Sequence, residues 1–376
     1  MPNHQGSYTE KEIYGQPELW RKTYQLVYSE KRWIKELFDK VTANPATEII
    51  LTGAGTSGFI GNTVEGIVQK ELGLRTRAVA TTDLITHPEY FLSKKNATLL
   101  ISFARSGDSP ESVEAYRISD QYCKHIDHLI ITCNRDGALA RKAVNNNTYV
   151  LLLPEGANDQ GLAMTGSFTS MLLTALLVTG IDNLESNQRY VDLAATYSNR
   201  VLEQYMGQLK TIAAKKFERV VLLGSGSNLG IAREGALKIQ ELSDGAIICT
   251  YDSFLGFRHG PKAVVNNKTL IIYIFSGNPL VYQYELDLAQ SIEEKSNYLD
   301  TLGIRESDIP ELALGNSILL NSQESPQLKQ FFTLCAIIPI QALAYYKSVN
   351  LKLDPDNPSR NGAISRVVQG VTIYSR

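Results

Sequence analysis

An internal repeat constrains the fold of this chain more than any other feature of its 376 residues. Three pairs of segments match: 220–227 with 49–56 and 269–272 with 98–101, both at an offset of 171 residues, and 276–277 with 106–107 at an offset of 170. Segments that match repeatedly at one spacing are the signature of a duplicated structural unit. A chain of this length is also expected to divide into two domains with separate cores. The sequence therefore predicts two copies of one unit.

Each copy alternates short apolar segments with helical ones. In the first copy, strands are expected at 49–52, 77–82, 98–103, 128–132 and 149–153, with helices that end near residues 72 and 122 and a further helix at 160–179. Strands that are apolar throughout indicate a parallel sheet with helices on both faces. The predicted fold is therefore α/β, with two tandem three-layer αβα units that each contain a parallel sheet.

The repeat and its flanks also predict the division of the chain. We expect a helical segment at 1–45, a first domain at 46–200, a second domain at 201–353 and a tail at 354–376. Near the end, 327–346 is expected to be an apolar helix kinked by Pro339, because proline removes a hydrogen bond from a helix interior. Residues 367–374 are expected to form a last strand.

Composition excludes some classes of function. Hydrophobic residues make up 43% of the chain and charged residues 20%, as in ordinary globular proteins. The net charge of −2 gives no general attraction to nucleic acid or to acidic membranes. We find no long apolar run, no N-terminal signal pattern and no CxxC pair among the four cysteines. A cytoplasmic protein without nucleic-acid or membrane partners is expected.

Two turns of the first copy are predicted to bind an anion. The turn 53–58 follows one strand and opens a helix, and its glycines allow backbone N–H groups to approach a ligand. The turn 104–109 follows another strand in the same way and adds hydroxyls and a guanidinium. Such turns meet at the carboxyl edge of a parallel sheet, where ligands bind. The expected ligands of a small monophosphate are Gly55, Thr56, Ser57, Arg105, Ser106 and Ser109.

Both turns have alternatives. The spacing Gly-x-Gly-x-x-Gly also suits a dinucleotide, with Asp83 on the ribose, although a pyrophosphate does not need the hydroxyls of this turn. The same glycines also suit a tight turn that binds nothing. In the second turn, Ser106 or Asp108 is equally suited to cap a helix.

Catalytic groups are predicted in the second copy. Glu234, Lys238 and Glu241 are spaced i, i+4, i+7, so they share one helix face, and His259 follows in a loop. These residue types can carry protons during catalysis. The corresponding segment of the first copy, 61–65, has no such set, so we expect one copy to bind substrate and the other to catalyse. The alternative is a solvated helix face beside an unrelated histidine.

The other histidines give weaker indications. His125 and His128 are three residues apart, but no third ligand is near, so we predict surface positions and no metal site. His87 precedes an aromatic loop that could approach the site.

The motifs and their order resemble the double sugar-isomerase (SIS) domain family. The matching segments are 53–58, 106–109, 234–241 and 259–261. The chain is similar to the isomerase half of glucosamine-6-phosphate synthase over nearly its whole length. Thr165 and 252–261 make it most similar to the tagatose-6-phosphate ketose/aldose isomerase group, whose members are associated with galactosamine-6-phosphate deamination.

The resemblance implies roles for the matching residues. The hydroxyls of the first copy and Arg105 would hold the sugar phosphate, and Glu241 would move a proton between C1 and C2 of the open-chain sugar. His259 would assist ring opening from a neighbouring subunit, which implies a homodimer or larger homo-oligomer with shared active sites. Lys238 would bias the charge of Glu241. No metal or organic cofactor is expected, because the adjacent imine or carbonyl already acidifies the C2 proton.

The implied reaction converts galactosamine 6-phosphate to tagatose 6-phosphate and ammonia. Alternatives are a glucosamine-6-phosphate deaminase, a ketose/aldose isomerase that releases no ammonia, and a non-catalytic sugar-phosphate sensor. The sequence departs from the synthase in two places. Ala104-Arg105 replaces Ser-Gln, and Gln369 stands where the synthase tail has a lysine, with Arg366 as the nearest cation.

Overall fold

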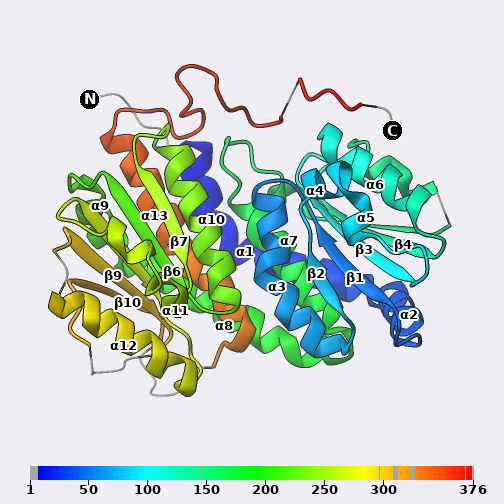
Figure 1. Ribbon diagram of the computed structural model, residues 1–376, viewed down its shortest axis with the longest axis horizontal. Coiled ribbons are helices and arrows are strands. Elements are labelled where there is room, and N and C mark those ends of the chain that lie inside the picture. Colours follow the sequence, from blue (N-terminus) through cyan, green and yellow to red (C-terminus); the bar gives the residue numbers. More distant parts are fainter. Residues whose placement is uncertain are drawn as a thin grey trace. The chain divides into compact units, whose positions relative to one another are not determined.

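The computed structural model describes residues 7–144, 146–295, 297–307, 312–321, 327–368 and 370–374. Its strands are β1 Glu48–Thr52, β2 Thr76–Ala78, β3 Thr98–Ala104, β4 Ile126–Thr132, β5 Thr148–Leu152, β6 Arg219–Gly224, β7 Ile248–Asp252, β8 Thr269–Ile274, β9 Asp300–Arg305 and β10 Asn316–Leu319. They form two five-stranded sheets, in the orders β2-β1-β3-β4-β5 and β7-β6-β8-β9-β10 (Figure 1). All paired strands in both sheets run parallel, as predicted.

The helices lie before, between and after these strands. They are α1 Tyr8–Ser29, α2 Lys31–Thr42, α3 Thr56–Leu72, α4 Thr81–Thr86, α5 Pro88–Phe91, α6 Pro110–Tyr122, α7 Gly166–Thr179, α8 Leu184–Gln204, α9 Met206–Ala214, α10 Ser227–Leu242, α11 Phe254–Phe257, α12 Pro279–Lys295 and α13 Phe332–Asn350. Short 3₁₀ helices occur at Ala140–Val144, Glu155–Ala157, Ile181–Asn183, Pro261–Val264 and Lys329–Phe331.

The chain divides into two compact units, one around each sheet. The unit of the first sheet contains Glu18–Asp159, Met164–Gln188 and the described part of Ile364–Arg376. The unit of the second sheet contains the described parts of Met1–Pro17 and Arg189–Ala363, together with Gln160–Ala163. The domain boundaries expected at 46–200 and 201–353 remain a prediction.

Helices cover both faces of each sheet. In the first unit, α4, α5 and α6 pack on the face that presents Ile50 and Leu100. The helices α3 and α7 pack against each other, with α3 against β1, β2 and β3 and α7 against β4. In the second unit, α11 and α12 pack on the face that presents Val221 and Ile271, and α10 lies with α13 against β6 and β7. Every residue of β1 and β3 is buried, as expected for strands covered on both sides. Each unit is therefore a three-layer αβα sandwich, as predicted.

The strand register confirms the internal repeat. Glu48 of β1 stands opposite Thr98 of β3, and Arg219 of β6 stands opposite Thr269 of β8. Both members of the second pair lie 171 positions after their counterparts, which is the offset seen in the sequence. The two copies therefore share their pairing as well as their motifs.

Some element predictions were wrong at their ends. The strand expected at 77–82 is only Thr76–Ala78, because the chain turns into α4 at Thr81. The helix expected at 160–179 begins at Gly166, and the one expected at 327–346 is Phe332–Asn350 with Pro339 inside it. No strand occurs in the described part of 367–374.

The N-terminal segment is helical, as predicted, but it is not merely peripheral. Trp20, Val27 and Ile34 are fully buried, and the Trp20 indole donates a hydrogen bond of 2.9 Å to Thr169 within the first unit.

Among the described residues, the stretch Lys329–Asn350 is long and apolar enough to cross a membrane. The helical segments Gly166–Thr179 and Ile181–Gln204, which meet at a bend of 90°, are a second candidate span if they are taken together. The apolar part of Lys329–Asn350 is 89% buried inside the protein, which is the usual situation of a core helix.

Candidate active site

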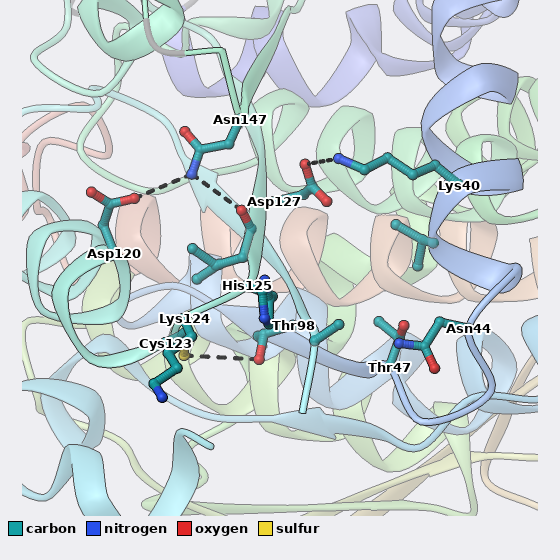
Figure 2. A pocket seen from close by; sticks show the side chains of 13 residues that line it. Lys40, Asn44, Thr47, Thr98, Asp120, Cys123, Lys124, His125, Asp127 and Asn147 are labelled. Atoms are coloured by element: carbon teal, nitrogen blue, oxygen red, sulfur yellow. Dashed lines mark hydrogen bonds and ion pairs between the residues drawn. The ribbon is translucent and has the colours of Figure 1, made fainter. Parts of the chain in front are cut away.

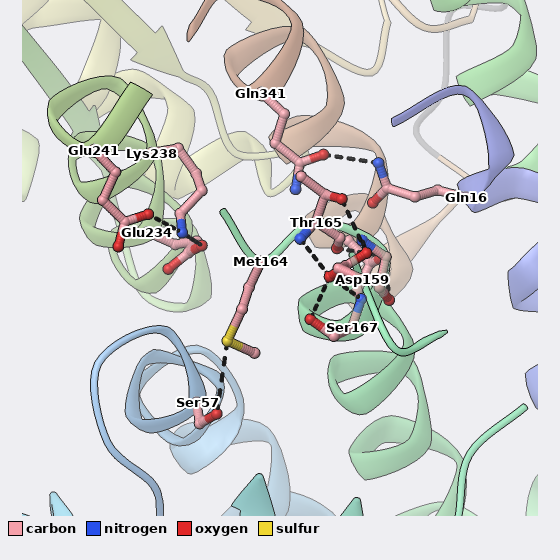
Figure 3. Close-up of polar contacts among 12 residues, drawn as sticks. Gln16, Ser57, Asp159, Met164, Thr165, Ser167, Glu234, Lys238, Glu241 and Gln341 are labelled. Atoms are coloured by element: carbon pink, nitrogen blue, oxygen red, sulfur yellow. Dashed lines mark hydrogen bonds and ion pairs between the residues drawn. The ribbon is translucent and has the colours of Figure 1, made fainter. Parts of the chain in front are cut away.

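The turn between β1 and α3 depends on two glycines. Gly55 has a φ of 54° and a ψ of −130°, which a side chain would rarely tolerate. A Cβ at Gly53 would lie 2.5 Å from the backbone of Ser57, so this position also requires glycine. Thr56 and Ser57 open α3 and are buried, and the Ser57 hydroxyl lies 4.0 Å from the Met164 sulfur (Figure 3).

The turn between β3 and α6 lies at the same edge of the sheet. β1 and β3 are parallel neighbours, with Thr52 opposite Ser102, so both turns leave the sheet at adjacent carboxyl ends. The Ser106 hydroxyl accepts a hydrogen bond of 3.3 Å from the Asp108 backbone N–H. Ser109 stands at the N-cap of α6, but its side chain makes no capping hydrogen bond. The first sheet thus brings the predicted phosphate-binding hydroxyls to one edge.

The alternative in which Ser106 or Asp108 caps α6 is wrong. The Asp108 carboxylate accepts a hydrogen bond of 2.8 Å from the Ala138 N–H, which lies in another loop. Neither Ser106 nor Asp108 is the N-cap residue of α6.

Arg105 is held inside the protein. It is only 6% exposed, and its Nη2 donates a hydrogen bond to the backbone carbonyl oxygen of Arg366. Arg366 in turn donates from Nε to the Asp159 carbonyl oxygen at 2.8 Å. The phosphate contact expected of Arg105 stays a prediction. The tail position Gln369 lies outside the described residues.

The charged face of α10 is buried, so the alternative of a solvated helix face is wrong. Lys238 is 1% exposed and Glu234 is fully buried, whereas the side chain of Glu241 retains 21% of its exposure. The Lys238 Nζ lies 2.5 Å from Glu241 Oε2 and 3.4 Å from Glu234 Oε1 (Figure 3). Because burying unpaired charges is costly, the lysine compensates both carboxylates. The arrangement presents one carboxylate toward solvent at the end of a buried charged row.

His259 lies in an exposed turn after α11. Ser253 caps this short helix by accepting a hydrogen bond of 3.0 Å from the Gly256 N–H, and Phe254 and Phe257 are buried beneath it. The turn is therefore anchored while the imidazole remains accessible.

In the second sheet, a buried carboxyl group lies at the turn between β8 and α12, which corresponds to the turn between β3 and α6. Glu285 of α12 is fully buried, and its Oε2 accepts a hydrogen bond of 2.7 Å from the backbone N–H of Ser276. Burial raises the pKa of Glu285 to about 7, although the bonds from Ser276 and the Ser225 side chain lower it in part. This turn thus receives a carboxyl group from its own chain.

Three further histidines, His87, His125 and His128, lie in the first unit. His128 is buried in β4, so its predicted surface position was wrong, and burial lowers its pKa to about 4 despite the nearby Asp120. His125 and His87 are exposed, and His87 stacks on Tyr90 with ring centroids 5.1 Å apart. No group of three or more metal-ligating side chains occurs within the described ranges.

A polar cavity of about 530 Å³ lies at the amino ends of β3 and β4 (Figure 2). Its lining includes Lys40, whose Nζ is 2.6 Å from Asp127, and Asn147, which donates a hydrogen bond to Asp120 at 3.2 Å. None of the predicted site residues lines this cavity, because they lie at the carboxyl edge of their sheet or on the second unit.

Comparisons with known proteins place this geometry in a family. A model of the SIS domain matches residues 44–179. The D-galactosamine-6-phosphate deaminase AgaS of Shewanella sp. (strain ANA-3) is 38% identical over 371 residues, which are 98% of this chain and 92% of that protein. The chain belongs to the D-galactosamine-6-phosphate deaminase AgaS family. The resemblance predicted from the motifs is thereby confirmed.

Solved structures extend the comparison. The tagatose-6-phosphate ketose/aldose isomerase of Escherichia coli is 33% identical, with a TM-score of 0.91, and the match covers all of this chain and 98% of that one. The C-terminal domain of glucosamine-fructose-6-phosphate aminotransferase from Francisella tularensis has a TM-score of 0.76 at 20% identity, covering 93% of this chain and 98% of that one. The latter shows a common fold, as the motif order had indicated for the synthase.

In this AgaS-family chain, sequence reasoning missed two residues that the structure brings forward. Asp159 is buried, and its carboxylate accepts a hydrogen bond from the Thr165 N–H at the start of α7. The helix was expected to begin at residue 160, so a contact between Asp159 and residues 165–167 was not foreseen. The Asn-Asp-Gln-Gly run at 158–161 was the available signal for a turn. Glu285 was missed because an acid within a helix is usually solvated, and only the repeat alignment would have directed attention to it.

Proposed function

We propose that this protein converts galactosamine 6-phosphate and water to tagatose 6-phosphate and ammonia. The observation that carries the proposal is the partly exposed Glu241 carboxylate, which lies 2.5 Å from the buried ammonium of Lys238. A carboxylate held in this way is suited to exchange a proton with a bound substrate. The 38% identical relative that is named for this deamination supports the substrate.

The proposed chemistry is a proton shift followed by hydrolysis. With the sugar ring open, Glu241 removes the proton from C2, which the C1 aldehyde acidifies, and returns a proton to C1. The C1 oxygen takes up the proton that the amine nitrogen gives up, so C1 becomes an alcohol. The amine-bearing C2 thereby becomes an imine. Water adds to this imine and ammonia leaves, so that the ketose remains. Glu241 ends in its starting charge state, and the sequence of steps needs no electron acceptor.

The first copy is proposed to hold the phosphate of the substrate. The hydroxyls of Thr56, Ser57, Ser106 and Ser109, the backbone of Gly55 and the guanidinium of Arg105 would supply its hydrogen bonds. The adjacent carboxyl ends of β1 and β3 support this grouping. A dianionic phosphate is favoured at such turns because helix N-termini carry backbone donors and a partial positive charge.

His259 is proposed to assist ring opening in the active site of a neighbouring subunit. Its exposure on an anchored turn supports this role. Mixing Glu241→Gln with His259→Ala tests it, because a site that draws these residues from different chains regains activity in mixed dimers. About one quarter of the wild-type activity is expected in a fully exchanged mixture. Activity that stays at the level of the separate variants would remove the shared site.

An assay on purified protein tests the reaction itself. Ammonia and ketose are measured with galactosamine 6-phosphate, glucosamine 6-phosphate and their N-acetyl forms. We expect both products in equal amounts from galactosamine 6-phosphate. Turnover of glucosamine 6-phosphate in preference to it would assign the gluco alternative.

The second candidate is a ketose/aldose isomerase without deamination. The 33% identical structure named as a tagatose-6-phosphate ketose/aldose isomerase favours it. The same proton transfer would serve both reactions, so ammonia is the discriminating product. Interconversion of a neutral aldose 6-phosphate and its ketose, without ammonia from any amino sugar, would establish this alternative.

A further inference from the structure

The described tail of the chain makes an anchored contact with the first-copy turns. Arg366 donates hydrogen bonds of 2.8 Å from Nε to the Asp159 carbonyl oxygen and from Nη2 to the Asn158 side-chain oxygen. Its own carbonyl oxygen accepts a hydrogen bond from Arg105. One tail residue therefore binds a loop with its side chain and a predicted phosphate ligand with its backbone.

The loop that receives Arg366 is itself fixed. The buried Asp159 carboxylate accepts hydrogen bonds of 2.8, 3.0 and 2.9 Å from the backbone N–H groups of Thr165, Gly166 and Ser167, and further bonds from two hydroxyls (Figure 3). These are N–H groups of the first turn of α7, which a carboxylate stabilises both by hydrogen bonding and by the helix dipole. The α7 helix is buried along its whole length, so this anchor is rigid.

Charge accumulates around the same contacts. The thiol of Cys133 has its pKa raised by burial and, in smaller part, by the Asp159 carboxylate, whereas Arg105 and Arg366 act in the opposite direction. Two guanidinium groups and one carboxylate therefore lie close to this buried cysteine.

We infer that Arg366 is a positioning residue for phosphate binding, which acts by holding the guanidinium of Arg105. A guanidinium carries its five N–H donors in one rigid plane, so a bond from one of them to a carbonyl fixes the plane in which the others lie. A buried arginine whose orientation is fixed in advance loses less entropy when it binds. The inference rests on the proposed function only in that the phosphate belongs to the substrate.

The test is a double-mutant cycle on Arg105 and Arg366. Arg366→Ala removes the anchor but leaves a backbone carbonyl, so we expect KM for the sugar phosphate to rise roughly tenfold with kcat within about twofold, the effect of one poorly oriented charge-assisted bond. Arg105→Ala should raise KM by at least as much. The double variant should be no worse than Arg105→Ala alone, because Arg366 acts through Arg105.

A tail arginine with no link to Arg105 provides the control. Arg360 donates from Nη2 to the carbonyl oxygens of Leu351 and Lys352 at 3.1 and 3.3 Å. Arg360→Ala should leave KM unchanged. If Arg366→Ala does not fold, Arg366→Lys and Asn158→Ala replace it, and each should raise KM by less than the full amount. Thermal melts of every variant establish that it is folded.

Binding of inorganic phosphate separates this inference from the proposed reaction. We expect Arg366→Ala to weaken phosphate binding, measured by titration calorimetry, by the same factor as KM, whichever sugar the enzyme uses. Additive effects in the cycle, a loss confined to kcat, or unchanged phosphate binding would each overturn the inference. Failure to release ammonia from galactosamine 6-phosphate would overturn the reaction and leave this result standing.

Discussion

The two copies of the repeat share the backbone of their turns at the carboxyl edge of the sheet. They differ in the side chains found at the second of these turns, which follows β3 in one copy and β8 in the other. Gly55 and Gly226 have nearly identical torsions, φ 54° and ψ −130° against φ 57° and ψ −126°. A Cβ at either Gly53 or Gly224 would clash with the backbone four residues on. In the second copy the Glu285 carboxylate receives the Ser276 N–H, whereas the first copy presents serine hydroxyls at the matching turn. The two copies therefore share the backbone of these turns and differ in the side chains that meet them.

The helices that follow the first turn of each copy, α3 and α10, differ in buried charge, which is found in the second copy. In α3, position 63 is a buried threonine whose hydroxyl bonds to the Phe59 carbonyl oxygen of its own helix at 2.8 Å. The corresponding residue of α10 is Glu234, which is paired with Lys238. Buried charge is therefore confined to the helix of the copy whose turn is already occupied. The comparison supports a division of labour, with binding in one copy and proton transfer in the other.

The largest effect is expected from removing the charge of Glu241. Glu241→Gln keeps the shape of the side chain but cannot accept the C2 proton, so kcat should fall by roughly 10²–10⁴-fold while substrate affinity changes only a few-fold. The matched position in the first copy is the exposed Lys70, and Lys70→Gln should have no effect. Steady-state assays and calorimetry with the substrate measure both. A Glu241→Gln enzyme that turns over normally would end its assignment as the base.

The Glu285 carboxyl should make the stability of the second unit depend on pH. Its folded pKa of about 7 lies above its ordinary value of 4.5. Between these values the folded state binds more protons than the unfolded state, so stability falls as pH rises through this window and levels off above about pH 7. The total is roughly 3 kcal/mol. Glu285→Gln should flatten the dependence of the melting temperature between pH 5 and 8.

The exposed Glu294 lies on the same helix and provides the control for this measurement. Glu294→Gln should retain the wild-type pH dependence. If Glu285→Gln loses stability toward alkaline pH as steeply as the wild type, the Glu285 carboxyl is not the group that causes this pH dependence.

The sequence predicted the repeat, the parallel sheets and the main strands because these depend on local patterns. Apolar runs such as Thr98–Ala104 are distinctive, and a shared offset of 171 residues survives however the side chains pack. The charged face of α10 was also predicted, since i, i+4, i+7 spacing alone aligns its members. Its burial was not, because a Glu–Lys–Glu row is more often solvated and only tertiary packing covers it.

Contacts distant in sequence were the part that local patterns could not supply. The bond from Arg105 to Arg366 joins residues separated by 261 positions, and no composition or periodicity indicates it. His128 was placed at the surface because no third metal ligand lies near it in the sequence, whereas β4 lies inside the sheet and buries it. The predicted roles of the site residues rest on chemistry that the fold permits, and they require the variants described here.

The sharpest test of the comparison uses a matched pair of serines. The Ser106 hydroxyl accepts a hydrogen bond from the Asp108 N–H at 3.3 Å, and the Ser276 hydroxyl accepts one from the Asn278 N–H at 3.1 Å. Both serines thus stabilise the same kind of turn, so alanine at either position should cost similar stability, about 0.5–1.5 kcal/mol. Only Ser106→Ala should also raise KM for the sugar phosphate, by roughly tenfold, because only that hydroxyl is proposed to reach the phosphate. Equal KM values for the two variants would show that the copies do not differ in phosphate binding, whatever their turns contain.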